Sequence, residues 1–214
     1  MANIFDALDY AASICWNENY GYRYGGHAAS YNDGVDCGGL VFHSLHHAGF
    51  NIPDTSPGVR NMRSYMINAG FSEIAYDRLT FVPQDGDIFC CFHPNNPDDP
   101  QDNAHGHTFY YAENIRAYTD ANANSDNIAI VQHAKVEASS TRGHSAPGDS
   151  RKNGTGAYWE VWVHAYNNLV DHSTYADSEV KVYRIGGTRL NKYLLFQWQD
   201  RKKHPLPINP NMLF

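Results

Sequence analysis

The sequence has little of several features that would assign a protein to a broad class at once. Its few basic residues leave a formal net charge of −7, which argues against a nucleic-acid-binding protein, since such a protein would present a basic face. No stretch is apolar enough to span a membrane. The first residues lack the basic and long apolar regions of a signal peptide, so we expect synthesis in a reducing cytoplasm.

Cysteine is also scarce, and the four residues present are Cys15, Cys37, Cys90 and Cys91. Cys90 and Cys91 are adjacent in an expected strand, so their side chains should point to opposite faces and not form a disulfide framework. Cys15 lies among apolar residues of an expected helix and is interpreted as a small core residue. Cys37 therefore needs a separate explanation.

The remaining composition is that of an ordinary globular protein. A chain of 214 residues with 42% hydrophobic and 18% charged residues is long enough for one well-buried domain. Apolar spacing predicts helices over residues 4–16, 37–48 and 59–69. Short apolar runs predict strands over residues 86–92, 107–112, 128–134, 159–164 and 180–185. Helices first and strands afterwards favour an α+β fold, with N-terminal helices packed on a central antiparallel sheet.

The most informative stretch surrounds Cys37. Turn residues Tyr24-Gly25-Gly26 precede Val35-Asp36-Cys37-Gly38-Gly39, and an apolar helical run follows. A thiol at a helix N-terminus lies where unpaired backbone N–H groups and the helix dipole favour the thiolate. Because the thiolate is the nucleophilic form, Cys37 is a candidate catalytic residue, although a cysteine in this position is more often a small buried residue.

Two histidines are candidates to complete a catalytic site with this cysteine. His107 follows Gly106 at the start of an expected strand, where a rigid element would hold an imidazole that takes and returns the thiol proton. His133 lies near the end of the next expected strand, and antiparallel pairing predicts that it lies beside His107 and orients it. Asp36 is expected to help position the turn and the substrate.

Ordinary structural roles compete with these assignments, because the chain has 12 histidines and chance pairings are expected. His43, His46 and His47 share one helix, but no nearby acidic or cysteine residue completes a metal site, so a solvated helix face is the preferred interpretation. His105 and His107 would share one strand face and are a weaker candidate metal pair. No metal or other cofactor is required by the preferred mechanism.

An ordered set of short motifs resembles the NlpC-type cell-wall cysteine peptidases, including bacteriophage peptidoglycan amidohydrolases. The motifs are Tyr24-Gly25-Gly26, Asp36-Cys37-Gly38-Gly39-Leu40-Val41, Gly86-Asp87-Ile88, Gly106-His107-Thr108, Gln132-His133-Ala134 and Pro147-Gly148-Asp149 with Trp159-Glu160-Val161-Trp162-Val163. The family usually has serine where this chain has Gly38. A backbone N–H at that position is still able to donate to an oxyanion.

The resemblance implies a papain-like α+β catalytic domain over residues 1–186, with residues 187–214 as a tail that serves as a docking segment. It implies hydrolysis of an amide bond in bacterial peptidoglycan, either as a stem-peptide endopeptidase or as an N-acetylmuramoyl-L-alanine amidase. Cys37, His107 and His133 would be the catalytic residues. Tyr24, Asp36 and Gly38 would contribute to substrate binding or to the oxyanion site.

The resemblance also implies a phage lysin that reaches the wall after release by a holin or as a virion component. The tail would then be able to contact phage tail proteins, and neither nucleic acid nor membrane insertion is expected. Two other functions remain open. One is a hydrolase or acyltransferase of the same fold that acts on another amide or ester, as a toxin-like effector would. The other is a non-catalytic phage structural or binding module.

Overall fold

The computed structural model describes residues 2–15, 22–23, 25–26, 34–92, 106–118, 128–139, 157–161 and 179–187. The helical elements are α1 (Ile4–Cys15), α2 (Cys37–His47), the 3₁₀ turn η1 (Val59–Asn61) and α3 (Met62–Asn68). The strands are β1 (Ser72–Ile74), β2 (Ile88–Phe92), β3 (Gly106–Ala112), β4 (Ile115–Tyr118), β5 (Ile128–Val131), β6 (Ala134–Ala138), β7 (Ala157–Val161) and β8 (Glu179–Arg184). The predicted α+β class is confirmed.

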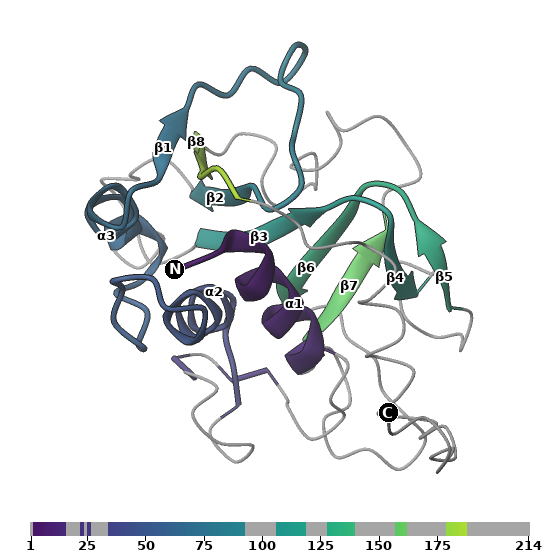
Figure 1. Ribbon diagram of the computed structural model, residues 1–214, viewed down its shortest axis with the longest axis horizontal. Helices are drawn as coiled ribbons and strands as arrows, with labels where there is room; N and C mark the ends of the chain where they lie inside the picture. Colours follow the sequence, from purple (N-terminus) through teal and green to yellow (C-terminus); the bar gives the residue numbers. More distant parts are fainter. Residues whose placement is uncertain are drawn as a thin grey trace, which may run out of the picture.

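Six strands form one sheet in the order β1-β8-β2-β3-β6-β7, and every neighbouring pair in it is antiparallel (Figure 1). The late strand β8 therefore lies between the two earliest strands. A separate hairpin of β4 and β5 lies between β3 and β6 along the chain. It leaves the sheet after Ala112 and returns at Ala134, which are paired with each other.

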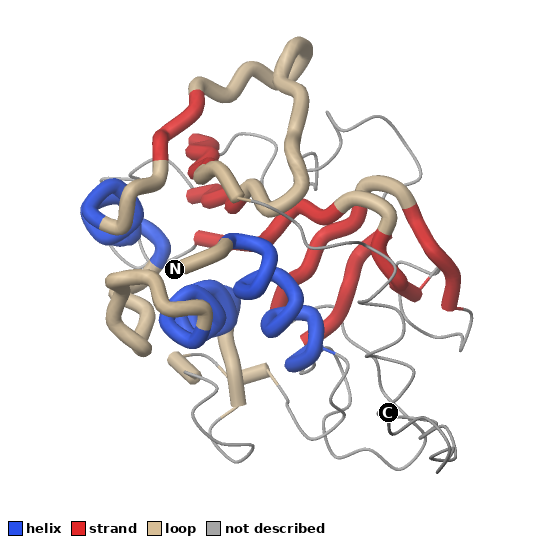
Figure 2. Tube along the Cα trace, in the orientation of Figure 1, coloured by secondary structure: helices blue, strands red, loops and turns tan. Residues whose placement is uncertain are grey.

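Helices α1 and α2 cover one face of the sheet (Figure 2). The larger apolar cluster lies between them and the strands, and it includes Leu8 of α1, Leu40 of α2 and Tyr110 of β3, none of which is exposed. The opposite face carries a smaller aromatic cluster that includes Phe89 and Phe109. Since side chains alternate along a strand, consecutive residues of β2 and β3 contribute to different clusters. As expected, Cys90 and Cys91 are divided in this way.

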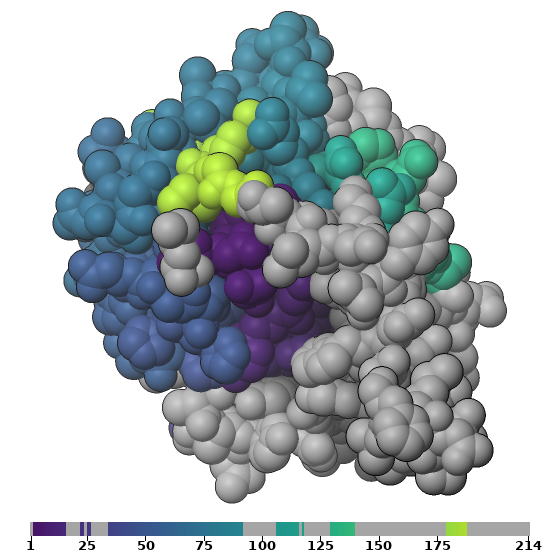
Figure 3. Space-filling model, in the orientation of Figure 1, coloured from purple at the N-terminus to yellow at the C-terminus, as the bar shows by residue number. Residues whose placement is uncertain are grey.

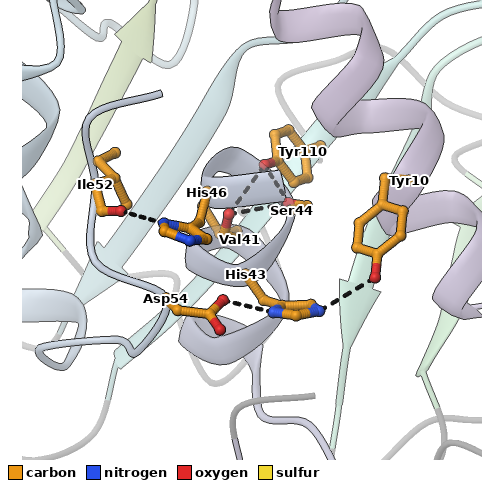
Figure 4. Close-up of polar contacts among 8 residues, drawn as sticks. All are labelled: Tyr10, Val41, His43, Ser44, His46, Ile52, Asp54 and Tyr110. Atoms are coloured by element: carbon orange, nitrogen blue, oxygen red, sulfur yellow. Dashed lines mark hydrogen bonds and ion pairs between the residues drawn. The ribbon is translucent and has the colours of Figure 1, made fainter. Parts of the chain in front are cut away.

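Helix α2 is fastened to β3 by buried hydrogen bonds (Figure 4). The Ser44 hydroxyl donates to the Val41 carbonyl at 2.9 Å and lies 2.7 Å from the Tyr110 hydroxyl. The Tyr110 hydroxyl also lies 3.2 Å from the Val41 carbonyl. Buried polar groups are costly unless they are paired, so this satisfied cluster fixes the helix relative to the strand.

The histidines of α2 have partners in neighbouring segments. His43 lies 2.6 Å from Asp54 through Nδ1 and 3.2 Å from the Tyr10 hydroxyl through Nε2 (Figure 4). His47 stacks on Tyr10 with ring centroids 3.6 Å apart, and the His46 Nδ1 atom is 2.8 Å from the Ile52 carbonyl. His46 and His47 are exposed, as the interpretation of a solvated face predicts. Their contacts connect α2 to α1 and to the following loop.

The Gly86-Asp87 pair at the start of β2 has a structural explanation. Asp87 is buried and binds Arg184 of β8 through two contacts of 2.7 Å, and it accepts a hydrogen bond of 2.8 Å from the Gln84 N–H. Gly86 has φ of 91°, and a Cβ there would lie 3.0 Å from Ile4. Only glycine adopts this conformation readily in so narrow a space. The motif therefore joins β2, β8 and α1.

The two ends of the described chain meet. A Cβ on Gly187 would lie 2.9 Å from Ile4 Cγ2, and Figure 3 shows the purple N-terminal residues and the yellow residues 179–187 next to each other on one face. None of the described helices is long and apolar enough to cross a membrane.

The observed elements differ from the predicted ones mainly in the middle of the chain. The expected strand over residues 128–134 ends at Val131, and a new strand, β6, begins at Ala134 after a turn. The third predicted helix begins as the 3₁₀ turn η1, and the short strands β1 and β4 were not predicted. The tail from residue 188 onward lies outside the described residues.

Candidate functional site

The N-terminus of α2 is organised by Asp36. Its carboxylate accepts hydrogen bonds from the Gly39 N–H at 2.5 Å and from the Gly25 N–H at 2.9 Å. This N-cap satisfies one of the free donors of the first turn, and it also holds the preceding glycine turn in place. The carboxylate of Asp36 is thus engaged in shaping the turn that carries Cys37, in line with one of the two expectations for it.

The glycines around Cys37 are needed because other atoms occupy the space beside them. A Cβ on Gly39 would lie 2.0 Å from the Gly26 carbonyl oxygen. The Gly26 oxygen in turn accepts a hydrogen bond of 3.2 Å from the Asp36 N–H. The turn at residues 25–26 is therefore packed directly on the first turn of α2. Tyr24, the other predicted residue of this turn, lies outside the described residues.

The fold brings Cys37 close to the start of β3, which carries Gly106 and His107. Cys37 and Gly106 are 69 positions apart in the sequence. The Cys37 Sγ atom lies 3.9 Å from the Gly106 carbonyl, and the Cys37 side chain is close enough to the His107 ring to raise its pKa. Both residues are 9% exposed, whereas Cys90 and Cys91 are 1% exposed. The predicted proximity of Cys37 and His107 is thus observed at the junction of α2 and β3.

The partner of His107 on its other side is Glu137. The His107 Nε2 atom contacts the Glu137 Oε2 atom in a very short hydrogen bond, and the Glu137 side chain is only 3% exposed. Tyr110 pairs with Val136 in the sheet, so Phe109 is opposite Glu137, and His107 is a diagonal neighbour of Glu137 on the same face. Since Nε2 binds the carboxylate, Nδ1 is the ring atom left to face the thiol.

The predicted pairing of His107 with His133 is wrong. His133 lies in the turn before β6 with φ of 57°, and its Nδ1 atom is 2.5 Å from the Tyr111 hydroxyl. Ala134 pairs with Ala112 at the far end of β3, five residues beyond His107. At about 3.3 Å per residue, roughly 17 Å of strand separates the two ends. The short strand β6 thus carries Glu137, and not His133, to His107.

The surroundings of His107 determine its charge. Burial lowers the pKa of His107, but the charge of Glu137 and the hydrogen bonds with Cys37 and Glu137 outweigh burial and raise it from 6.5 to about 9. The ring is therefore an imidazolium at neutral pH. A cation between a thiol and a carboxylate favours a negative charge on both neighbours.

A second cation contacts the same carboxylate. The Lys135 Nζ atom lies 3.6 Å from Glu137 Oε2, and the Lys135 side chain is 5% exposed. The ammonium group also lies over the Phe109 ring, 4.7 Å from its centroid. Glu137 is thus shared between His107 and Lys135, and neither Lys135 nor Glu137 was among the predicted site residues.

The other cysteines have no comparable environment. All four cysteines are free thiols. Burial raises the pKa of Cys90 to about 12, and it also raises the pKa of Cys15 and of Cys91. Of the four, Cys37 alone lies at a helix N-terminus, where the first-turn N–H groups of Cys37 and Gly38 have no intrahelical acceptor. Such groups are able to donate to an oxyanion, as proposed for Gly38.

A single segment supports both halves of the site. A Cβ on Gly38 would lie 2.3 Å from the Ser56 hydroxyl oxygen, and a Cβ on Gly106 would lie 3.0 Å from the Val59 Cβ. The segment from Ser56 to Val59 therefore fills the space beside Gly38 and the space beside Gly106, the chain neighbours of Cys37 and His107. We call this segment the 56–59 buttress.

The described residues contain no group of three or more His, Cys, Asp or Glu side chains that could hold a metal ion. His105, one half of the weaker candidate metal pair, lies outside the described ranges.

Comparison with known proteins leaves the arrangement to be interpreted from its own chemistry. No family model matches the sequence, and no curated protein matches it either. The sequence signal that could have identified Glu137 is the alternation of charged and apolar residues in Lys135-Val136-Glu137-Ala138, directly after His133-Ala134. Period-two alternation of this kind predicts a strand.

Proposed function

We propose that the protein is a cysteine hydrolase with a papain-like arrangement, and that it cleaves an amide bond of bacterial peptidoglycan. The observation that carries the proposal is the line formed by the Cys37 thiol, the His107 ring and the Glu137 carboxylate at the N-terminus of a helix. A nucleophile, a proton carrier and an orienting group in hydrogen-bonding sequence are the elements of thiol catalysis. Glu137 replaces His133 as the orienting group of the proposal.

In the first half of the reaction, the Cys37 thiolate attacks the carbonyl carbon of the amide and forms a C–S bond. The developing oxyanion lies at the start of α2, where the N–H groups of Cys37 and Gly38 are suitable donors. The His107 imidazolium then gives its Nδ1 proton to the amide nitrogen, the C–N bond breaks, and the amine leaves. A thioester with Cys37 and a neutral imidazole remain.

In the second half, the neutral His107 ring takes a proton from water, and the water oxygen attacks the thioester carbonyl. The C–S bond breaks, and its electron pair returns to sulfur as the thiolate beside the imidazolium. Throughout, the hydrogen bond from Nε2 to Glu137 holds the ring so that Nδ1 faces Cys37. This sequence of steps consumes one water for each amide bond and requires no cofactor.

The choice of peptidoglycan as substrate rests on the ordered motifs that resemble NlpC-type cell-wall peptidases. The same resemblance supports a role as a phage lysin that acts on the wall after release or as a virion component. It also supports contacts between residues 187–214 and phage tail proteins.

The proposal predicts that Cys37→Ala folds normally but releases no amines or muropeptides from purified cell walls. Cys15→Ser is the matched control for loss of a free thiol on a helix. The Cys15 thiol lies 3.7 Å from the Glu137 main-chain carbonyl, and because serine keeps a donor there, hydrolysis should be retained. Mass analysis of the wild-type digest identifies the bond from the new termini, and parallel assays on protein and lipid-ester substrates test the other substrate classes. Wall hydrolysis retained by Cys37→Ala would exclude the thiol mechanism.

A further inference from the structure

The catalytic steps proposed above make no use of Lys135, although it is one of the most buried charged residues described. Its side chain is 5% exposed, and that of Glu137 is 3% exposed. Lysine is almost never buried this far unless it is paired. Its ammonium is 3.6 Å from the Glu137 carboxylate and lies over Phe109. Lys135 therefore belongs to the same buried cluster as the candidate site.

The pairing gives a line of alternating charges. One oxygen, Glu137 Oε2, contacts both the His107 Nε2 atom and the Lys135 Nζ atom. With the Cys37 side chain interacting with the same ring, the order is thiol, imidazolium, carboxylate and ammonium. A buried carboxylate that is shared by two cations attracts each of them less than a carboxylate that serves one alone.

We propose that Lys135 is a positioning residue that shares the Glu137 carboxylate and repels a proton on His107, and so allows the imidazole to become neutral during the reaction. The inference rests on the proposed thiol hydrolase function, because only the two-step reaction requires His107 to change its charge.

The requirement is strongest in the thioester intermediate. At that stage the sulfur is neutral, and His107 must be an unprotonated ring in order to take a proton from the attacking water. Glu137 opposes this, because its negative charge stabilises the imidazolium. Lys135 counteracts Glu137 without breaking the hydrogen bond that orients the ring.

Other groups near His107 do not supply a competing cation among the described residues. Within the described ranges, Cys37 of α2 and Glu137 of β6 act on the ring, Cys91 of β2 is its partner in the sheet, and Lys135 of β6 contacts Glu137. Burial raises the pKa of Cys91, so this thiol stays neutral. Lys135 thus shares the Glu137 carboxylate with His107.

The size of the effect follows from the shared oxygen. Two cations that contact one oxygen lie within about 6 Å, and at an effective dielectric constant of about 20 their repulsion lowers a pKa by roughly two pH units. We therefore expect Lys135→Met to raise the pKa of His107, which is about 9 in the wild type, by about one to two pH units. Methionine keeps an apolar chain of similar length over Phe109.

The experiment follows the His107 ring by nuclear magnetic resonance as the pH is raised, together with the pH dependence of Cys37 alkylation by iodoacetamide. The charge-retaining variant Lys135→Arg should keep the wild-type titration. Lys181→Met is the matched control, because Lys181 is a more exposed lysine, 32% exposed, that pairs with Glu73 and Glu179 away from His107. It should leave both profiles unchanged.

The expected result is an upward shift of the His107 titration in Lys135→Met, and an acyl-enzyme mass that accumulates on cell walls. An unchanged or lower His107 titration would overturn the proposal. If Lys135→Met does not fold, Lys135→Gln is titrated in its place with the same expected direction. Titration and alkylation need no substrate, so they test the role of Lys135 independently of hydrolysis. Failure of the wild-type protein to hydrolyse walls would contradict the proposed function and not the role of Lys135.

Discussion

Replacement of Glu137 by glutamine tests the central contact of the site with little change in shape. The pKa of His107 rises from 6.5 to about 9, and at about 1.4 kcal/mol for each unit this is a net stabilisation of the imidazolium by roughly 3 kcal/mol. Glutamine keeps an oxygen near Nε2 but removes the charge. Burial, which opposes a proton on the ring, remains in the variant.

We therefore expect the pKa of His107 to fall by at least about two units in Glu137→Gln, to about 7 or below. Hydrolysis by the thiol mechanism should fall at least about 100-fold, since the ring loses the carboxylate charge that stabilises the imidazolium and is oriented only by a neutral amide. The His107 titration by nuclear magnetic resonance measures the first effect, and product release measures the second. His133→Gln, which alters the histidine 2.5 Å from Tyr111, should change neither.

The same substitution leaves the Lys135 ammonium buried without its carboxylate. Loss of one partner of a buried ion pair costs about 3–5 kcal/mol, so urea unfolding should show a marked loss of stability. The double variant Glu137→Gln with Lys135→Met removes both charges and should recover much of it. A His107 titration that is unchanged in Glu137→Gln, or that falls equally in His133→Gln, would show that Glu137 does not set the pKa of His107.

Two further predictions concern stability and the helix N-terminus. Because the pKa of His107 is raised in the folded state, its contribution to stability is complete below pH 6.5 and is lost as the pH rises through about 9. The free energy of unfolding in urea should therefore fall by roughly 3 kcal/mol between these pH values. A His107→Gln variant with the same pH dependence would contradict this prediction. Gly39→Ala should lower the free energy of unfolding by about 1–3 kcal/mol and the rate of hydrolysis at least tenfold. The reason is that its Cβ would lie 2.0 Å from the Gly26 oxygen and 3.1 Å from the Asp36 carboxylate. Gly186→Ala, where a Cβ meets nothing within 4 Å, is the control for both measurements, and equal behaviour of the two variants would argue against the packing described for the turn.

The sequence predicts the first two helices well because their apolar spacing is regular, and Gly49 marks the end of the second. Helix α1 (Ile4–Cys15) and helix α2 (Cys37–His47) match the predicted ranges to within one residue at each end. Strand β6 was missed because it contains Lys135 and Glu137, and charged residues usually indicate solvent, whereas here the two charges are buried together. The turn before it contains neither glycine nor proline, so His133 with positive φ gave no signal.

The candidate site was predicted in part for the same physical reasons. Cys37 and His107 each lie at the end of a regular element and beside glycines, which local sequence reveals. The third member depends on strand register, and the β4–β5 hairpin inserts between β3 and β6 without any local signal of where pairing resumes. A shift from His133 to Glu137 is a shift of four residues in register, and local sequence does not determine register at that scale.

The 56–59 buttress has a consequence for any effort to redesign this protein. Because Ser56 occupies the volume beside Gly38 and Val59 the volume beside Gly106, enlarging either glycine would displace the same short segment. Substitutions in this segment should therefore disturb the packing beside both glycines at once. Libraries that aim to alter substrate selectivity are best directed at other positions, with Gly38, Ser56, Val59 and Gly106 held constant.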